Sequence, residues 1–103
     1  MIFRRRFSAV ISRQLDLFAI DEAALLVEVR EAEQTYNRAD REDAKEMYGD
    51  YVDVVETATE ALADMRDRYK RTLDEESAEE YDAAFNRAVK RRWPPFGLEI
   101  ENR

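Results

Sequence analysis

The chain has 103 residues, enough for one domain, and its 24 acidic and 17 basic side chains give a formal charge of −7. It contains no cysteine and no histidine, which excludes disulfides, thiolate nucleophiles, sulfur-ligated metals and every catalytic arrangement that needs an imidazole. Its two isolated glycines, Gly49 and Gly97, are too few for a phosphate-binding loop, so we expect a non-catalytic protein without a cofactor.

The first expected element is a long helix over residues of about 4–37. Nine positions from Ile11 to Ala39 alternate in spacing between four and three residues, and eight of them are apolar or aromatic. The exception is Glu22. Residues 19–22 resemble a second helix start, but the apolar stripe keeps its phase across them. We therefore expect one continuous helix here.

The second expected element is a helix over residues 41–73. From Ala44 to Thr72 the same alternating spacing recurs, and again eight of nine positions are apolar or aromatic. A turn at residues 37–40 is short enough to make the two helices antiparallel. A repeat of 3.5 residues predicts a long antiparallel helical hairpin with a coiled-coil-like heptad seam.

The last expected elements are a shorter helix and a tail. Ser77 and Glu80 have the spacing of a capping box, which places a third helix at residues 78–92. The pair Pro94-Pro95 ends that helix and leaves residues 94–103 as an extended apolar tail. The predicted fold is thus all-α, with one helical-bundle domain over residues 1–93. The tail either folds back over the open end of the hairpin or docks onto a partner, through Trp93, Phe96, Leu98 and Ile100.

The leading functional expectation is self-association. The third helix is about half as long as the hairpin, so it leaves apolar and aromatic side chains near the loop uncovered. A homodimer is the most economical way to bury these side chains, and a different protein partner is the alternative. We therefore expect a helical interaction or assembly module whose interface comprises Tyr36, Met47, Tyr48, Tyr51, Val52 and Val55.

An alternative function follows from the distribution of charge. Folding the hairpin brings basic residues from both ends of it together in what we call the basic pole, which predicts a peripheral binder of anionic lipid or nucleic acid. Acidic residues at 74–80 neutralise part of this pole, and the net charge of −7 opposes nucleic-acid binding. The basic pole comprises Arg4, Arg5, Arg6, Arg13, Arg66, Arg68, Lys70 and Arg71.

A second alternative is a carboxylate-only metal site centred on Glu22. Glutamates from two chains could converge there and hold a divalent cation through oxygen ligands. Di-iron helical bundles also use histidine, which this chain lacks, so a glutamate that reaches solvent from the edge of the stripe explains the residue more simply. With no long uncharged segment and no recognisable signal peptide, we expect a cytoplasmic protein.

Overall fold

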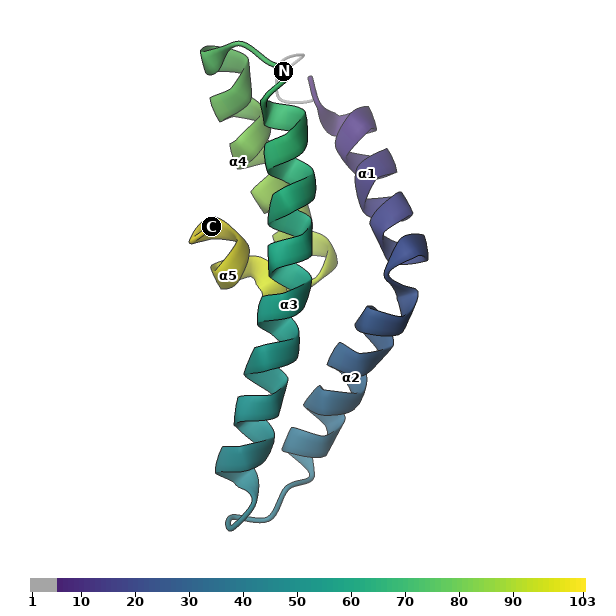
Figure 1. Cartoon of the computed structure of the whole chain (residues 1–103), viewed down its shortest axis with the longest axis vertical. Coiled ribbons are helices and arrows are strands. Elements are labelled where there is room, and N and C mark those ends of the chain that lie inside the picture. The colour runs from purple at the N-terminus through teal and green to yellow at the C-terminus, as the bar shows by residue number, and fades with distance from the viewer. Residues whose placement is uncertain (1–5) are drawn as a thin grey trace.

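The computed structural model describes residues 6–103, which are almost entirely helical and form an elongated molecule of 50 × 25 × 24 Å (Figure 1). No strand occurs within this described range, so the predicted all-α class is confirmed. The elements are α1 (Ser8–Asp21), α2 (Ala23–Asn37), α3 (Ala44–Lys70), α4 (Glu75–Arg92), the 3-10 helix η2 (Pro94–Phe96) and α5 (Gly97–Glu101).

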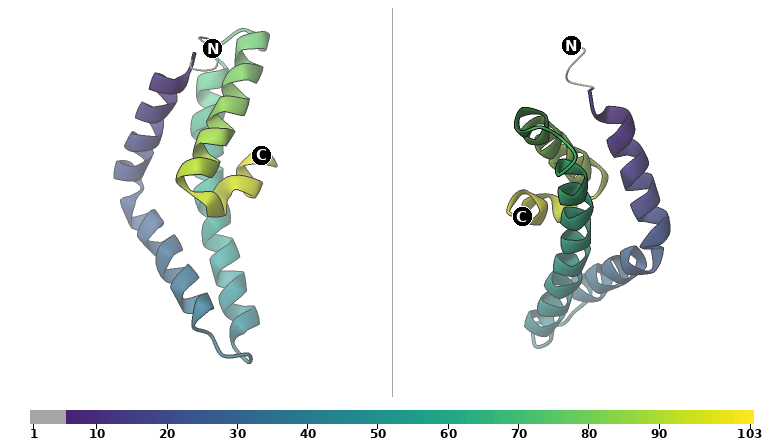
Figure 2. Two further views of the ribbon diagram at one scale, coloured as in Figure 1. Left: turned by 180° about the vertical axis from the view of Figure 1, so that it is seen from behind. Right: turned by 45° about the horizontal axis from the view of Figure 1, so that its top comes forward.

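Helix α3 is the spine of the molecule, and the other helices are arranged along it. Helix α2 lies beside α3 and joins it through the loop at residues 38–43 (Figure 1). Helix α4 packs on the opposite half of α3, away from that loop, and η2 and α5 pack against α3 and α4 (Figure 2). Near the loop the molecule therefore consists of α2 and α3 alone, whereas the other half of α3 is packed with α4, η2 and α5, and α1 lies beside α4.

The first long helix is divided at Glu22, whereas the sequence predicted continuity. Glu22 has φ −111° and ψ 30°, outside the helical region, although its N–H still donates to the Phe18 carbonyl at 2.8 Å. The break allows α1 to lean onto α4 while α2 remains on α3, and Phe18 packs edge-on against Trp93 with 5.6 Å between ring centroids. The apolar stripe keeps its spacing, but its two halves face different partners.

Two helix starts also differ from the prediction. Helix α3 begins at Ala44, after a turn in which the Asp40 carbonyl accepts from the Asp43 and Ala44 N–H groups. Helix α4 begins three residues earlier than expected, because Asp74 is its N-cap and accepts from the Ser77 N–H at 2.9 Å. This contact lowers the pKa of the Asp74 carboxyl. The capping function belongs to the aspartate upstream of the serine.

The C-terminal segment is helical, not extended as the sequence suggested. After Trp93 the chain forms η2 and then α5, which bury Phe96 and Ile100. These side chains lie four residues apart, on one face of a helix, while Leu98 is 74 % exposed. The segment thus completes the core of its own chain.

The core runs through the half of the molecule that contains α1, α4 and α5. Its apolar members come from every helix, and the polar Thr59, Arg66 and Ser77 are buried among them. The apolar members of this core are Phe7, Ile11, Leu15, Phe18, Val29, Val55, Ala58, Leu62, Ala63, Tyr81, Phe85, Val89, Phe96 and Ile100.

No helix of residues 6–103 combines the length and apolarity that a membrane span needs.

Candidate interaction surfaces

The loop end of α2 and α3 projects from the molecule without a core of its own. None of the 25 residues at 30–54, which we call the distal arm, is buried. The nearest buried residues are Val29 and Val55, at the two edges of this segment. In most proteins, helix stability comes from packing an apolar face, so this arm is incomplete as a folding unit.

Three tyrosines form a partly exposed cluster on the distal arm. Tyr36 stacks on Tyr51 with 6.3 Å between ring centroids and lies 5.2 Å from Tyr48. The Tyr51 hydroxyl donates to Glu33 at 3.4 Å, and partial burial together with this carboxylate raises the Tyr51 pKa. Tyr48 is 51 % exposed. Aromatic side chains that are rigid and partly desolvated are typical of interface anchors.

The structure separates the predicted interface residues into two groups. Met47, Tyr51 and Val52 are half-buried on the distal arm, as is Tyr36. Val55 is only 5 % exposed and belongs to the core, so it is not available to a partner. The first group, with Tyr48, forms the apolar surface that the chain leaves open near the loop.

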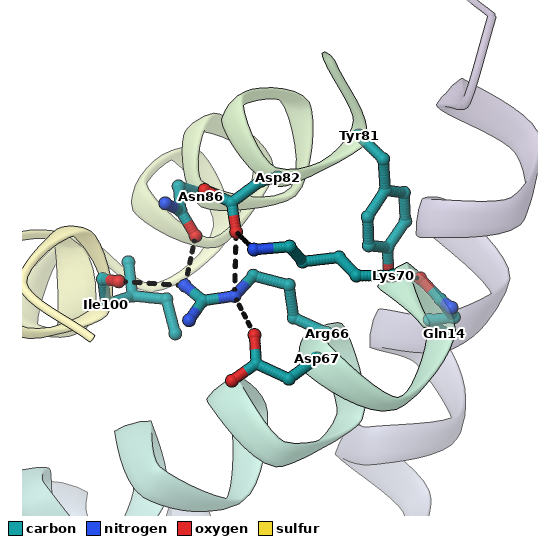
Figure 3. Close-up of polar contacts among 8 residues, drawn as sticks. All are labelled: Gln14, Arg66, Asp67, Lys70, Tyr81, Asp82, Asn86 and Ile100. Carbon is teal, nitrogen blue, oxygen red and sulfur yellow. Dashed lines mark hydrogen bonds and ion pairs between the residues drawn. The ribbon is translucent and has the colours of Figure 1, made fainter. Parts of the chain in front are cut away.

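Arg66 from the predicted basic pole is buried in a polar network that ties α3 to α4 and α5 (Figure 3). Its Nη1 donates to Asn86 Oδ1 at 2.9 Å and to the Ile100 carbonyl at 3.0 Å. Its Nε lies 2.9 Å from Asp67 Oδ1 and 3.1 Å from Asp82 Oδ1. The guanidinium is 2 % exposed and therefore serves the fold, not an external anion.

The other members of the basic pole are divided between internal contacts and solvent. Lys70 Nζ donates to Asp82 Oδ1 at 2.9 Å. Arg6 donates to Ser77 Oγ at 2.9 Å and stacks on Phe7, with 5.0 Å from its Cζ to the ring centroid. The remaining members of the basic pole are Arg13, Arg68 and Arg71, which are exposed, and Arg4 and Arg5, which lie outside the described residues. Binding of anionic surfaces by this pole stays a prediction.

Glu22 occupies the joint between α1 and α2 and is half-buried there. Within residues 6–103 no three acidic side chains are grouped closely enough to hold a metal ion. A metal site at Glu22 would thus require ligands from a second chain, and it stays a prediction.

A groove of about 440 Å³ runs between α1 and α4. Ile11 and Leu15 from α1 and Ala84 and Ala88 from α4 supply its apolar lining. Its polar lining residues are Ser8, Ser12, Arg87, Arg91 and Arg92. The sequence showed the basic C-terminal end of α4. The inclination of α1 that forms the groove, however, depends on the break at Glu22.

A further surface was missed by the sequence reasoning. Leu17, Ile20 and Val27 are 50 %, 71 % and 45 % exposed on α1 and α2. Leu17 and Ile20 follow the buried Leu15 and Phe18 by two residues, or about 200° around α1, and so lie on its opposite face. Val27 follows the partly buried Leu25 by two residues on α2. The sequence signal for this surface was the three-residue spacing of Leu17 and Ile20, which repeats the spacing of Leu15 and Phe18 two residues later.

Comparison with known proteins adds no relative to this description. No protein-family model matches the chain, and no curated protein or solved structure is significantly similar to it.

Proposed function

We propose that this chain is a non-catalytic helical assembly module that binds a second copy of itself through the distal arm. The observation that supports it is the 25-residue arm at 30–54, which has no buried side chain and yet carries a tyrosine cluster. Burying apolar area at a symmetric interface would supply the packing that the arm lacks.

The proposal includes the predicted hairpin with its heptad seam. The positions spaced by four and three residues along α3 include the buried Val55, Ala58 and Leu62, and α2 lies alongside them. Below Val55 the same series continues to Tyr51 and Tyr48, which α2 covers only in part. A partner helix would extend the same packing toward the loop.

Tyr48→Asp is the substitution that tests this proposal. Tyr48 is half exposed, so a charge there leaves the core intact and places an unpaired carboxylate in the interface. We expect the wild-type chain to sediment as a dimer at about 100 µM, and the variant to dissociate at least tenfold more readily, which is about 1.4 kcal/mol or more. Far-UV circular dichroism should show the same helix content in both.

Leu98→Asp is the matched control, because Leu98 is also a large exposed hydrophobic side chain, at 74 %, but lies on α5, away from the arm. It should leave the dimer unchanged. A wild-type chain that is monomeric, or a folded Tyr48→Asp variant that dimerises as well as the wild type, would overturn the proposal.

A further inference from the structure

The side of α3 that α4 and α5 cover in one half of the molecule is covered only in part in the other half, where Tyr36 of α2 lies 5.2 Å from the Tyr48 ring and leaves Tyr48 51 % exposed. Arg66 faces α4 and α5, since it contacts Asn86 and the Ile100 carbonyl. Tyr48 precedes it by 18 residues, or five turns of 3.6 residues, and therefore faces the same side. Val52 precedes the fully buried Thr59 by seven residues and is close to this side as well. Seen from behind in Figure 2, α4 ends partway along α3, so the part of α3 nearer the loop has no α4 in front of it.

The groove between α1 and α4 offers a surface of the complementary kind. Its lining combines apolar side chains with Arg87 and Arg91, both of them exposed. Neither arginine forms an ion pair with a carboxylate of residues 6–103, whereas Arg92 is bound to Asp16 at 2.6 Å. The groove thus presents free positive charge beside an apolar floor.

The charges of the arm and of the groove are opposite. The second half of the distal arm and the two residues that follow it, 41–56 together, contain six acidic and two basic side chains. Residues 87–92 contain four basic side chains and no acidic one. The α1 edge of the groove, from Ser8 to Leu15, is about 10–12 Å long, similar to the length of α3 between Tyr48 and Glu56. The two surfaces match in charge and in extent.

On the basis of the proposed self-association, we propose that the distal arm of one copy lies in the α1–α4 groove of a second copy. Tyr48 and Val52 would pack on Ala84 and Ala88, the partly exposed apolar residues of the groove, with Asp53 and Glu56 next to Arg87 and Arg91 of the other copy. Because Tyr48 faces the side on which α4 lies, a two-fold axis perpendicular to the long axis lets each copy place its arm in the groove of the other. In this arrangement α4 of each copy covers the part of α3 that the other copy's own α4 leaves uncovered.

A charge-exchange experiment distinguishes this arrangement from other dimers. One variant, Arg87→Glu with Arg91→Glu, has a reversed groove and a native arm, and a second, Asp53→Arg with Glu56→Arg, has a native groove and a reversed arm. Each variant alone should dimerise about tenfold or more weakly than the wild type, because like charges meet at both contacts. In a 1:1 mixture both contacts have opposite charges, so native mass spectrometry should show the heterodimer.

The control for the reversed groove is Arg68→Glu with Arg71→Glu, which makes the same charge change at exposed positions outside it. This control should dimerise like the wild type. If Arg87→Glu with Arg91→Glu is folded and dimerises normally while Tyr48→Asp does not, the groove is not the docking site and the proposed function stands. If the wild type is monomeric, both proposals are wrong. If the mixture gives no heterodimer, the reciprocal arrangement is refuted.

Discussion

Arg66→Met is expected to destabilise the protein, although Arg66 lies in a region that the charge pattern suggested was an exposed basic surface. The methionine retains most of the buried volume but removes every polar contact of the guanidinium. The Asn86 side-chain oxygen and the Ile100 carbonyl then lose a donor at 2.9 Å and 3.0 Å. Asp82 keeps Lys70 as a partner, so its carboxylate is not left uncompensated.

The magnitude follows from the burial of each partner. Each orphaned acceptor in a buried site costs about 1–3 kcal/mol. Removing one member of a fully buried ion pair costs about 3–5 kcal/mol, but Asp67 and Asp82 are 43 % and 31 % exposed and water can replace part of their contacts. Two such acceptors would cost about 2–6 kcal/mol, and because Asn86 is only half-buried we expect the lower end, a loss of about 2–3 kcal/mol in the free energy of unfolding, or on the order of 10 °C in Tm.

Urea unfolding followed by far-UV circular dichroism measures this loss at fixed protein concentration. Arg68→Met is the control, since Arg68 is exposed two residues away on the same helix, and it should change stability by no more than about 0.5 kcal/mol. Equal stabilities for the two variants would refute the assignment of Arg66 to the core.

Three further predictions test other parts of the structure. Burial raises the pKa of Tyr81 to about 12, so deprotonation favours the unfolded chain and about 2–3 kcal/mol of stability should be lost as pH rises from about 10 to 12. Tyr81→Phe should remove this component from the stability–pH profile, and an unchanged profile would contradict it. Gly49→Ala should raise the free energy of unfolding by about 1 kcal/mol, because an added Cβ has no atom within 4 Å, and a loss of stability would mean that this position is not an open helical site. Phe96→Ala should cost about 3–5 kcal/mol in thermal or urea unfolding while Leu98→Asp costs less than about 0.5, since the first side chain is 1 % exposed and the second 74 %, and similar losses would show that the C-terminal segment is packed differently.

The helical periodicity of the sequence predicted much of the core. Ile11, Leu15 and Phe18 from the first stripe and Val55 and Leu62 from the second are all buried. A repeated apolar spacing is a local property of the chain, and each helix must bury the face that it defines. Such positions can be identified without knowing which helix covers them.

The packing partners of those faces could not be predicted in the same way. The break at Glu22 directs α1 toward α4, and no local pattern distinguishes that choice from a continuous helix on α3. The burial of Arg66 likewise depends on α5 crossing α3, because an arginine in a charged helix is usually exposed. The spacing of Phe96 and Ile100 was a readable helical signal, although the adjacent prolines suggested an extended tail.

The candidate surfaces show the same division. The sequence identified the uncovered aromatic side chains near the loop, since a third helix of half the length cannot cover both ends of a hairpin. It did not identify the groove next to Arg87 and Arg91, which exists only because α1 and α4 lie side by side. Surfaces made by two helices far apart in the chain require the tertiary structure.

The mass of the wild-type protein in solution is the most direct test of self-association. Sedimentation equilibrium between about 1 and 100 µM should give a mass that rises toward twice the 12.2-kDa chain, with weaker association at high salt. A mass of 12.2 kDa throughout this range would contradict the proposal that the distal arm binds a second copy.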